Sequence, residues 1–451
     1  MSDRSARAQD QVVATTTERW TRSSGLAAGS VTALLLAAIG LIAGRIDIAL
    51  LPLPLVAAIT LGWDRRPAPD ERATVTLSLT DTDSAAVNYD LAIATPPRAE
   101  MIVLRYSVLG GQAREFVVAG RVGSIAELAG VVPLLHSGPQ ELVRFDYRFL
   151  GVDAISASLP QEPIVGERVV PPSQTMIDAL PLPRRLQAMT GSHESARLGD
   201  GGEFRDIHPF SPGDRLRRID WKATARRGQS PGDLYVRRSN ALADATVLIV
   251  MDSRDDVGEQ ITQWRSNVAV DKGVSSLDLA REAASSIAGA YIASGDRVGF
   301  QDLSSRARMI PHAGGGRHLW RLMKAIEVTA PSEVSFAHQR PPIVPPGALV
   351  YLLSSLLDDQ PVKLALTWLG NGHRVIAVDV LPPARFARTT RYERIAHRMV
   401  LMERDDRVRV LRARGVELLR WSEDGAALPL PGRLRLLSRP TRRLGSVGAP
   451  R

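Results

Sequence analysis

The densest group of chemically capable side chains lies between residues 198 and 226, which we call the charged segment. Two or more carboxylates beside a histidine can perform acid–base catalysis, and the segment holds Glu203, Asp206, His208 and Asp214. Arginines and lysines are interleaved with these acids. Because a guanidinium can hold a carboxylate through two parallel hydrogen bonds, the same mixture could fix an irregular segment against a neighbouring domain. A hydrolase centre, a recognition surface and a solvated patch of both signs all remain open.

A second group of polar residues follows three predicted strands. It comprises Asp252 to Asp256, Ser354-Ser355 and Asp379-Val380. Open α/β sheets bind ligands beyond the carboxyl ends of their strands, so these residues are predicted to form the functional edge of a sheet.

Common catalytic motifs are absent from the sequence. It contains no Gly-x-x-x-x-Gly-Lys-Ser/Thr phosphate loop, no Gly-x-Ser-x-Gly elbow and no His-Glu-x-x-His pair. The absence of cysteine excludes disulfides, thiolate zinc sites and thiol nucleophiles. ATP hydrolysis would therefore have to come from a partner.

Residues 241–425 are predicted to form the α/β domain that positions the second group. The run ATVLIVM at 245–251 is typical of a strand buried on both faces. Strands predicted over 297–300, 348–353, 374–380 and 416–421 alternate with helices over 277–294, 317–328, 361–369 and 392–414. This order predicts a mainly parallel, Rossmann-like sheet covered by helices on both faces.

Residues 64–170 are predicted to form an all-β, sandwich-like domain. Apolar and polar residues alternate over 74–79, 101–106 and 142–147, as in half-buried strands. Only 124–129 is a candidate short helix. Residues 171–240 then comprise a proline-rich linker and the charged segment, in which Asp214 is predicted to cap a helix beginning near Arg215.

Two apolar runs lie over residues 25–63, after a leader predicted over 1–24. Gly25 to Gly44 is uncharged and covers about 30 Å as a helix, the thickness of a bilayer core; Ile48 to Trp63 covers about 24 Å. Arginines flank the outer ends, whereas the loop between the runs has only Arg45. This predicts a transmembrane helical hairpin in the inner membrane, with both flanks and the soluble domains cytoplasmic. A cleaved signal peptide and a buried hairpin are the alternatives.

The formal net charge of +9 comes largely from residues 426–451, which contain six arginines and no acid. We predict a solvated basic tail, with attraction to an anionic membrane surface as the alternative. Nucleic-acid binding by the tail is a third hypothesis, while in the charged segment the interleaved acids would offset attraction to phosphate.

The string EFRDIHPFSPGDRLRRIDWKATAR, from residue 203 to 226, resembles the signature of a bacterial family, domain of unknown function 58. The corresponding signature residues are Glu203, Phe204, Arg205, Asp214, Arg218, Asp220, Trp221 and Arg226. Similar proteins have two N-terminal membrane spans, a strand-rich region, this signature and a von Willebrand factor A-like domain. The same order is predicted for this chain.

The resemblance implies a metal hypothesis. Von Willebrand factor A-like domains can hold Mg²⁺ with Asp-x-Ser-x-Ser after the first strand and an Asp after the fourth. Asp252 matches the first position, but Arg254 and Asp256 replace the two serines, and Ser354 and Ser355 stand where the later acid is expected. A guanidinium at residue 254 would repel a divalent cation and neutralise the carboxylate at 252. We predict a degenerate site with no cofactor and no tightly bound metal.

The resemblance also implies a partner, because family members are typically found beside a MoxR-type AAA+ ATPase. The leading expectation is a membrane-anchored scaffold or adaptor that presents the degenerate domain to this ATPase in complex assembly or maturation, with no catalytic residue and with other membrane proteins as possible partners. The alternative is an unrecognised hydrolase centred on Glu203 to Asp220.

Overall fold

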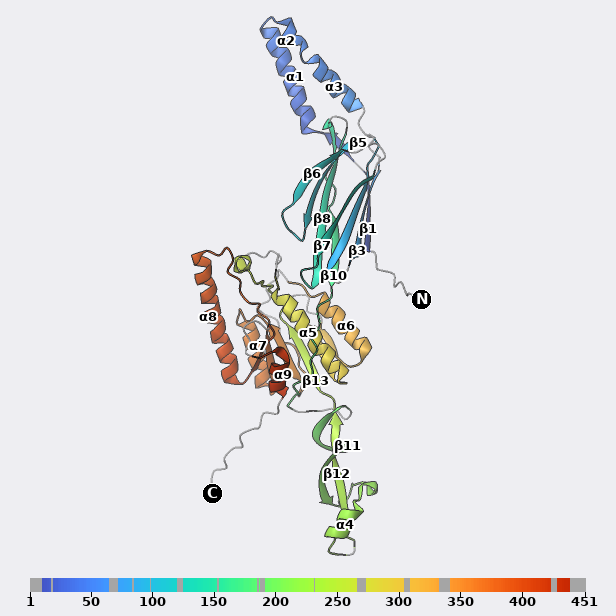
Figure 1. The fold of residues 1–451 in the computed structure, drawn as a ribbon, viewed down its shortest axis with the longest axis vertical. Coiled ribbons are helices and arrows are strands. Elements are labelled where there is room, and N and C mark those ends of the chain that lie inside the picture. Colours follow the sequence, from blue (N-terminus) through green and yellow to red (C-terminus); the bar gives the residue numbers. More distant parts are fainter. Residues whose placement is uncertain are drawn as a thin grey trace. The chain divides into compact units, whose positions relative to one another are not determined.

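The computed structural model describes residues 10–17, 19–64, 72–82, 85–97, 99–119, 125–151, 154–184, 186, 191–230, 232–265, 273–303, 309–331, 341–422 and 428–438. The chain divides into two compact units. The first is Met1–Leu135 with Pro139–Val169, and the second is His136–Gly138 with Val170–Arg451. Figure 1 labels many of the helices and strands of both.

Two sheets form the β-rich part of the first unit. One has the order β1 (Asp10–Thr17), β3 (Arg72–Asp81), β4 (Ala86–Ala94) and β7 (Ile125–Pro133). The other has the order β2 (Trp20–Arg22), β9 (Ser156–Ser158), β8 (Gly138–Gly151), β5 (Ala99–Val108) and β6 (Arg114–Ala119), with β10 (Ile164–Val170) also pairing β8. Alternate residues of β3 and β4 are buried, and side chains from both sheets share one apolar core. The predicted β-rich domain is therefore confirmed.

Two parts of this unit differ from the sequence predictions. Residues 10–17 and 20–22 fall in the predicted leader, but they form β1 and β2, and β1 pairs antiparallel with β3. The run VVATTT explains β1, because β-branched residues favour extended structure. Residues 125–133, which include most of the candidate short helix, form β7 instead.

An apolar helical hairpin lies in the chain between β2 and β3. It comprises α1 (Ser24–Ile42), α2 (Ile46–Leu50) and α3 (Leu53–Asp64). The stretches Ser24–Ile42 and Ile46–Asp64 are each 19 residues long, have mean hydropathies of 2.1 and 1.9, and are only 11% buried. Both are long and apolar enough to cross a membrane.

The two ends of the hairpin meet. The Arg22 guanidinium lies 5.3 Å from the centre of the Trp63 ring, at the start of α1 and the end of α3. Near the other end, a Cβ on Gly40 would lie 2.3 Å from the backbone nitrogen of Ala49, so α1 and α2 touch through backbone and only glycine fits there.

A mixed six-stranded sheet forms the centre of the second unit. Its order is β15 (Met309–Ala313), β14 (Arg297–Asp302), β13 (Thr246–Met251), β16 (Leu349–Ser354), β17 (Arg374–Asp379) and β18 (Glu417–Arg420). All neighbours are parallel except β14 and β15. When the strands are numbered in chain order, the sheet has the doubly wound order 3-2-1-4-5-6. The direction in which successive strands are added to the sheet reverses between β13 and β16. The residues just beyond these two strands, together with those beyond β17, form what we call the rim.

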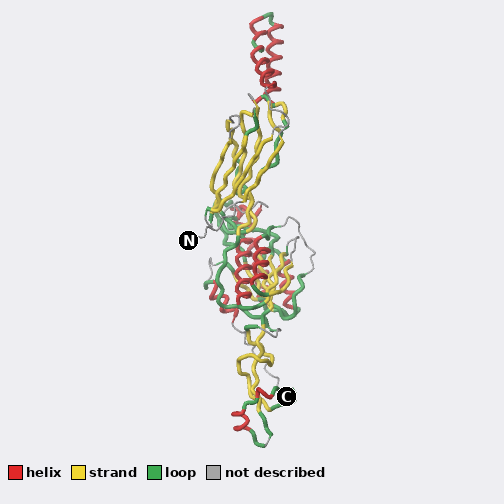
Figure 2. Tube along the Cα trace, turned by 90° about the vertical axis from the view of Figure 1, so that its right-hand side faces the viewer, coloured by secondary structure: helices red, strands yellow, loops and turns green. Residues whose placement is uncertain are grey.

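Helices cover both faces of this sheet (Figures 1 and 2). The side chains of Val247, Ile249 and Met251 pack in one core with α5 (Ser276–Ala293), α6 (Gly316–Glu327) and α9 (Leu430–Ser438). Leu248 and Val250 face the other core, with α7 (Gln360–Gly370) and α8 (Arg391–Arg414). Because successive side chains of a strand point to opposite faces, the continuous apolar run at 245–251 is explained by burial on both sides.

The helix α9 lies within the predicted basic tail. Leu430 and Leu434 are buried in the core, and the Arg433 guanidinium donates to the backbone carbonyls of Arg420 and Ser422. Residues 430–438 are thus packed rather than solvated, while the last four arginines of the tail lie outside the described residues.

Candidate functional site

An arginine side chain fills the part of the rim between β13 and β16, where the strand order of the sheet reverses. Arg254 donates to both carboxylate oxygens of Asp252, from Nε to Oδ1 at 2.7 Å and from Nη2 to Oδ2 at 2.9 Å. The two side chains are only 14% and 8% exposed. The predicted neutralisation of Asp252 by Arg254 is therefore confirmed as a two-pronged ion pair, the strongest geometry available to these groups.

Residues from β16 and α7 complete this network. The Ser354 hydroxyl donates to Asp252 Oδ2 at 2.8 Å, and Arg254 Nη1 reaches Gln360 Oε1 at 2.7 Å and Asp358 Oδ2 at 2.8 Å. Burial alone would lower the pKa of Arg254, but its hydrogen bonds with Asp252 and its contacts with Asp358 outweigh burial and raise the pKa. The guanidinium remains charged at any physiological pH.

The other predicted rim residues do not face Asp252. Asp256 accepts from the Leu277 backbone amide in the first turn of α5 at 3.1 Å. Ser354, rather than Ser355, contacts Asp252; the Ser355 carbonyl accepts from Arg404 at 2.9 Å. These residues do not fit a Mg²⁺ site, because the position in front of Asp252 is filled by a cation. Among the described residues, no group of three or more histidine, aspartate or glutamate side chains could hold a metal.

Asp255 lies next to this closed pair and is exposed. Desolvation raises the pKa of Asp255, and the negative charge of Asp252 adds to the effect. We assign no metal-ligand role to Asp255, because its carboxylate lies close to the positive charge of Arg254, which fills the position beside Asp252.

A small cavity of about 240 Å³ lies at the other end of the rim, beyond β17 and β18. Its walls include Trp264, His397 and the segment Leu381–Ala384. The Asp379 carboxylate at its edge is paired with Arg404 at 2.5 Å. Burial lowers the pKa of His397, whose ring packs edge-on against Trp264 and Phe386, so a structural role accounts for it.

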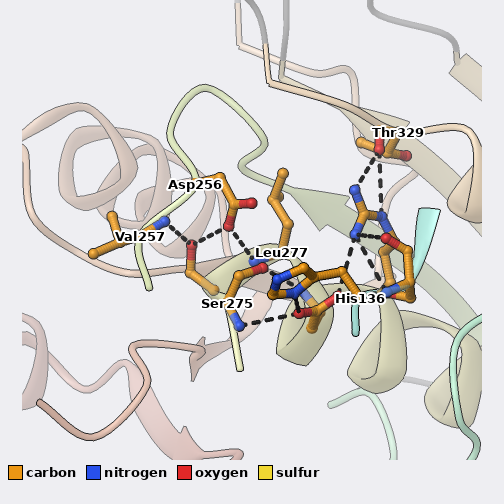
Figure 3. Close-up of polar contacts among 10 residues, drawn as sticks. His136, Asp256, Val257, Ser275, Leu277 and Thr329 are labelled. Carbon is orange, nitrogen blue, oxygen red and sulfur yellow. Dashed lines mark hydrogen bonds and ion pairs between the residues drawn. The ribbon is translucent and has the colours of Figure 1, made fainter. Parts of the chain in front are cut away.

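A second polar network surrounds the N-terminus of α5 (Figure 3). His136 Nδ1 lies 2.6 Å from Asp278 Oδ2, and the Ser137 amide and hydroxyl donate to Asp278 Oδ1 at 2.7 and 2.9 Å. Asp278 also forms a capping box with Ser275. Arg281, 4% exposed, donates to the carbonyls of Ser137 and Thr329 at 2.8 and 2.7 Å.

Asp278 makes the stability of this helix end depend on pH. Burial alone would raise the pKa of Asp278, but the hydrogen bonds from His136, Ser137 and Ser275 outweigh it and lower the pKa. A carboxyl group with a lowered folded-state pKa stabilises the fold above its unfolded pKa of about 4, and this contribution is lost as pH falls through the folded pKa. We expect the free energy of opening of α5, measured by hydrogen exchange, to fall below about pH 4, and to lose this dependence in Asp278→Asn. An acid dependence that survives the substitution would contradict this assignment.

The charged segment forms a two-stranded ribbon with a helical tip. The strand β11 (His193–Pro209) pairs antiparallel with β12 (Tyr235–Ala243), and the tip holds a 3₁₀ turn, η2 (Leu216–Arg218), and α4 (Trp221–Arg227). Asp220, not Asp214, caps the helix: its Oδ1 accepts from the Ala223 amide at 2.9 Å. Asp214 instead accepts from the Ser211 amide at 2.9 Å and closes a turn through Gly213, whose φ is +103°.

The predicted signature residues of this segment are mostly at the surface. Phe204 is 48% exposed beneath the guanidinium of Arg237, and Trp221 is 69% exposed. Arg205 and Arg226 are exposed, Arg218 is half-buried, and the Glu203 side chain lies outside what the structure describes. Within the described part of the chain, no hydrogen bond or ion pair joins Asp206, His208 and Asp214, so the proposed acid–base group is not brought together.

The ribbon, the sheet and the rim can now be compared with known proteins. Residues 206–387 match the family described as protein of unknown function DUF58. This DUF58 match begins in β11 and extends past β17, so it contains both the ribbon tip and the closed rim, and it supports the resemblance seen in the sequence. No curated protein matches the chain.

One solved structure is similar over part of the chain. It is described as the crystal structure of a Br derivative of BhCBM56, is 19% identical, and the match covers 21% of this chain and 91% of that one with a TM-score of 0.14. At this score the similarity carries no argument about fold or function.

Proposed function

We propose that the protein is a membrane-anchored scaffold or adaptor whose degenerate von Willebrand factor A-like domain and DUF58 ribbon bind a cytoplasmic AAA+ ATPase of MoxR type. The observation that carries the proposal is the closed rim. The Asp252 carboxylate, placed where a ligand of an open α/β sheet would be bound, is held by Arg254 and Ser354. A rim closed by its own ion pair favours recognition over metal-assisted or acid–base chemistry.

The hairpin supports the membrane anchor. Large apolar side chains such as Leu34, Leu41 and Ile42 are 72, 77 and 88% exposed, which water disfavours and lipid does not. The contact between Arg22 and Trp63 joins the two ends, so both flanks would emerge on the same side of the bilayer. The arginines of both flanks support a cytoplasmic orientation of that side, since positively charged flanks are typical of the cytoplasmic face of an inner-membrane protein.

The ribbon tip supports protein recognition. Leu216 and Trp221 are 68% and 69% exposed beside several arginines, and binding hot spots are rich in tryptophan and arginine. Acids such as Asp214, Asp220 and Asp233 are interleaved with these bases and are engaged as turn or helix caps. This mixture favours a protein partner over nucleic acid.

The test is capture of the ATPase from native membranes by crosslinking, followed by affinity and ATP turnover measurements with the purified pair. We expect Leu216→Ala with Trp221→Ala to weaken binding at least roughly tenfold, because a buried tryptophan anchor contributes about 2 kcal/mol or more. Trp320→Ala is the matched control, since Trp320 is 63% exposed on α6, outside the ribbon. Failure to recover any AAA+ protein would contradict the proposal. If the ribbon variant and Trp320→Ala weaken binding equally, the ribbon tip is not the binding site.

No observation favours the alternative hydrolase, because Asp206 and Asp214 are not joined to His208 by any bond in the described part of the ribbon. Turnover of an ester, peptide or glycoside that is lost in Asp214→Asn would revive it.

A further inference from the structure

The cavity beyond β17 and β18 is lined by one side of α8 and by the segment that follows β17. His397, Leu401 and Arg404 follow one another on α8 at intervals of four and three residues, so they form a row on one side of the helix. Leu381–Ala384 supplies further wall residues. The row covers about 10 Å of helix at 1.5 Å per residue. With a volume of about 240 Å³, the cavity is smaller than a drug-sized pocket and has room for a single ring.

The apolar walls favour an aromatic group. Leu381 and Pro382 are buried, and Trp264 lies in the 3₁₀ turn η3 (Ile261–Arg265) with its ring centre 5.0 Å from that of His397. The Trp264 Nε1 donates to a backbone carbonyl at 2.8 Å, so this residue can offer a ligand only its apolar ring. Flat side chains of this kind pack well against another ring.

The imidazole of His397 supplies a hydrogen-bonding atom to the same wall. His397 is 6% exposed, and its packing against Trp264 and Phe386 fixes the ring without using a hydrogen bond. Its Nε2 is buried and has no hydrogen-bond partner within the described ranges. Burial lowers the pKa of His397, so the ring is neutral at neutral pH, and Nε2 donates or accepts one hydrogen bond according to the tautomer. A ligand that pairs with this atom removes the cost of leaving it unpaired.

The charges of the wall are balanced. Arg404 donates to a backbone carbonyl at 2.9 Å and lies 2.5 Å from the Asp379 carboxylate, which also accepts from the Leu381 amide at 3.1 Å. The other two charged wall residues, Asp405 and Arg420, are one acid and one base, and both are exposed. The wall therefore carries no net charge, which favours an uncharged ligand because an ion would lose its hydration without gaining a counter-charge.

We propose that this cavity binds a phenol, with the aromatic ring among the apolar walls and the hydroxyl paired with Nε2 of His397. A phenolic hydroxyl both donates and accepts, so it suits either tautomer of the imidazole. A free phenolic molecule and a tyrosine side chain of another protein present the same chemistry. This binding uses neither the ribbon tip nor the pair of Asp252 and Arg254, so it does not depend on the proposed ATPase contact.

Two probes that differ only by the hydroxyl test the site: para-fluorophenol and fluorobenzene. Their binding to the full chain in detergent is measured by fluorine NMR relaxation, and each probe is compared with itself between variants, so that uptake into detergent cancels. We expect His397→Phe to weaken para-fluorophenol at least about threefold and to leave fluorobenzene within about twofold, because only the phenol loses a hydrogen bond. His312→Phe is the matched control. Its Nε2 is also buried with no partner in the described part of the chain, but it lies in β15, at the opposite edge of the sheet, and both affinities should stay unchanged.

A second variant tests the cavity without changing the histidine. Leu401→Trp fills the space beside His397 and should abolish binding of both probes. Displacement of para-fluorophenol by N-acetyltyrosinamide at similar concentration would identify a tyrosine side chain as the occupant, and rejection of this competitor would identify a free phenol. The proposal is overturned if para-fluorophenol binds the parent chain no better than Leu401→Trp, or if His397→Phe weakens both probes equally.

Discussion

Arg254→Ser is expected to destabilise the rim by about 3 to 5 kcal/mol, because it removes one partner of a buried ion pair and leaves the other charge in place. The Asp252 side chain is 8% exposed and would keep only the hydroxyl of Ser354 at 2.8 Å. Since Asp252 directly follows β13, the loss of stability should be greatest in β13 and β16, between which the strand order reverses. Hydrogen exchange of the β13 and β16 amides measures it as a change in the free energy of opening.

Two control variants separate the charge from the general effect of substitution. Asp252→Leu with Arg254→Met removes both charges and should recover most of the lost stability, since apolar replacement of a whole buried pair is often neutral. Arg407→Ser breaks the pair with Asp359, whose side chain is 67% exposed, and should change stability by less than about 1 kcal/mol. If Arg254→Ser and Arg407→Ser lower the stability by the same amount, the buried pair of Arg254 and Asp252 contributes no more than an exposed ion pair.

The same variant tests the metal hypothesis. Arg254→Ser restores Asp-x-Ser at residues 252–254 and removes the cation that fills the site. Mn²⁺ or Mg²⁺ should then return part of the lost stability, by about 2.7 kcal/mol at 100 times the dissociation constant. The parent chain should show no such gain. A micromolar affinity of the parent for either cation would refute the prediction of a degenerate site.

The strands of the central sheet were predictable because a strand that is buried on both faces is a continuous apolar run in the sequence. Residues 245–251 and 348–353 are continuous apolar runs, and β13 and β16 fall within them to one residue. The edge strand β15 was not predicted, since Met309–Ala313 is partly exposed and contains Pro311. An edge strand depends on pairing with its neighbour for its conformation. This pairing leaves a much weaker pattern in the sequence than burial on both faces does.

The candidate site was predictable only where its members are close in the chain. Arg254 and Asp252 are two residues apart, so their pairing followed from type and spacing. The choice of Ser354 over its neighbour depends on the register of β13 and β16, in which Met251 pairs with Leu353 and so brings Ser354 beside Asp252. The long pairing of β11 with β12 was missed, because Gly199, Gly201 and Gly202 interrupt the alternation that marks a strand.

The contacts of Arg281 were also missed, since they join it to Ser137, 144 positions away, and to Thr329, 48 positions away. One signal was present. The helix LDLAREAASSIAGAYIA places Arg281 among small and apolar residues, on a face that burial of Ala280 and Ala284 identifies as internal. A lone arginine on the internal face of a helix rarely lacks a partner.

Arg281→Ala is therefore the second variant with a large expected effect, about 3 to 5 kcal/mol. The guanidinium, 4% exposed, supplies donors to the Ser137 and Thr329 carbonyls at 2.8 and 2.7 Å, and both carbonyls would lose these donors. Burial lowers the pKa of Arg281 and the nearby charge of Asp278 opposes this, but a guanidinium is basic enough to stay protonated. Urea midpoints from pulse proteolysis of the full chain measure the loss.

Arg281→Lys and Arg317→Ala are the controls for this prediction. Lysine keeps the charge, but one ammonium cannot reproduce a planar fork, so Arg281→Lys should recover less than half of the stability lost in the alanine variant. Arg317 is exposed on α6, and its replacement should cost less than about 0.5 kcal/mol. Full recovery by lysine would show that charge, rather than the forked hydrogen bonds, holds the two carbonyls.

Gly138 allows the same contact to be tested from its other side. A Cβ at Gly138 would lie 2.5 Å from the centre of the Arg281 guanidinium, and the glycine has a φ of +85°. Gly138→Ala should therefore cost about 1 to 2 kcal/mol for the backbone and more for displacing the arginine. In the Arg281→Ala background only the backbone cost should remain, because the displaced group is gone. The two losses should then be less than additive, and strict additivity would mean that the two residues do not share the contact seen between them.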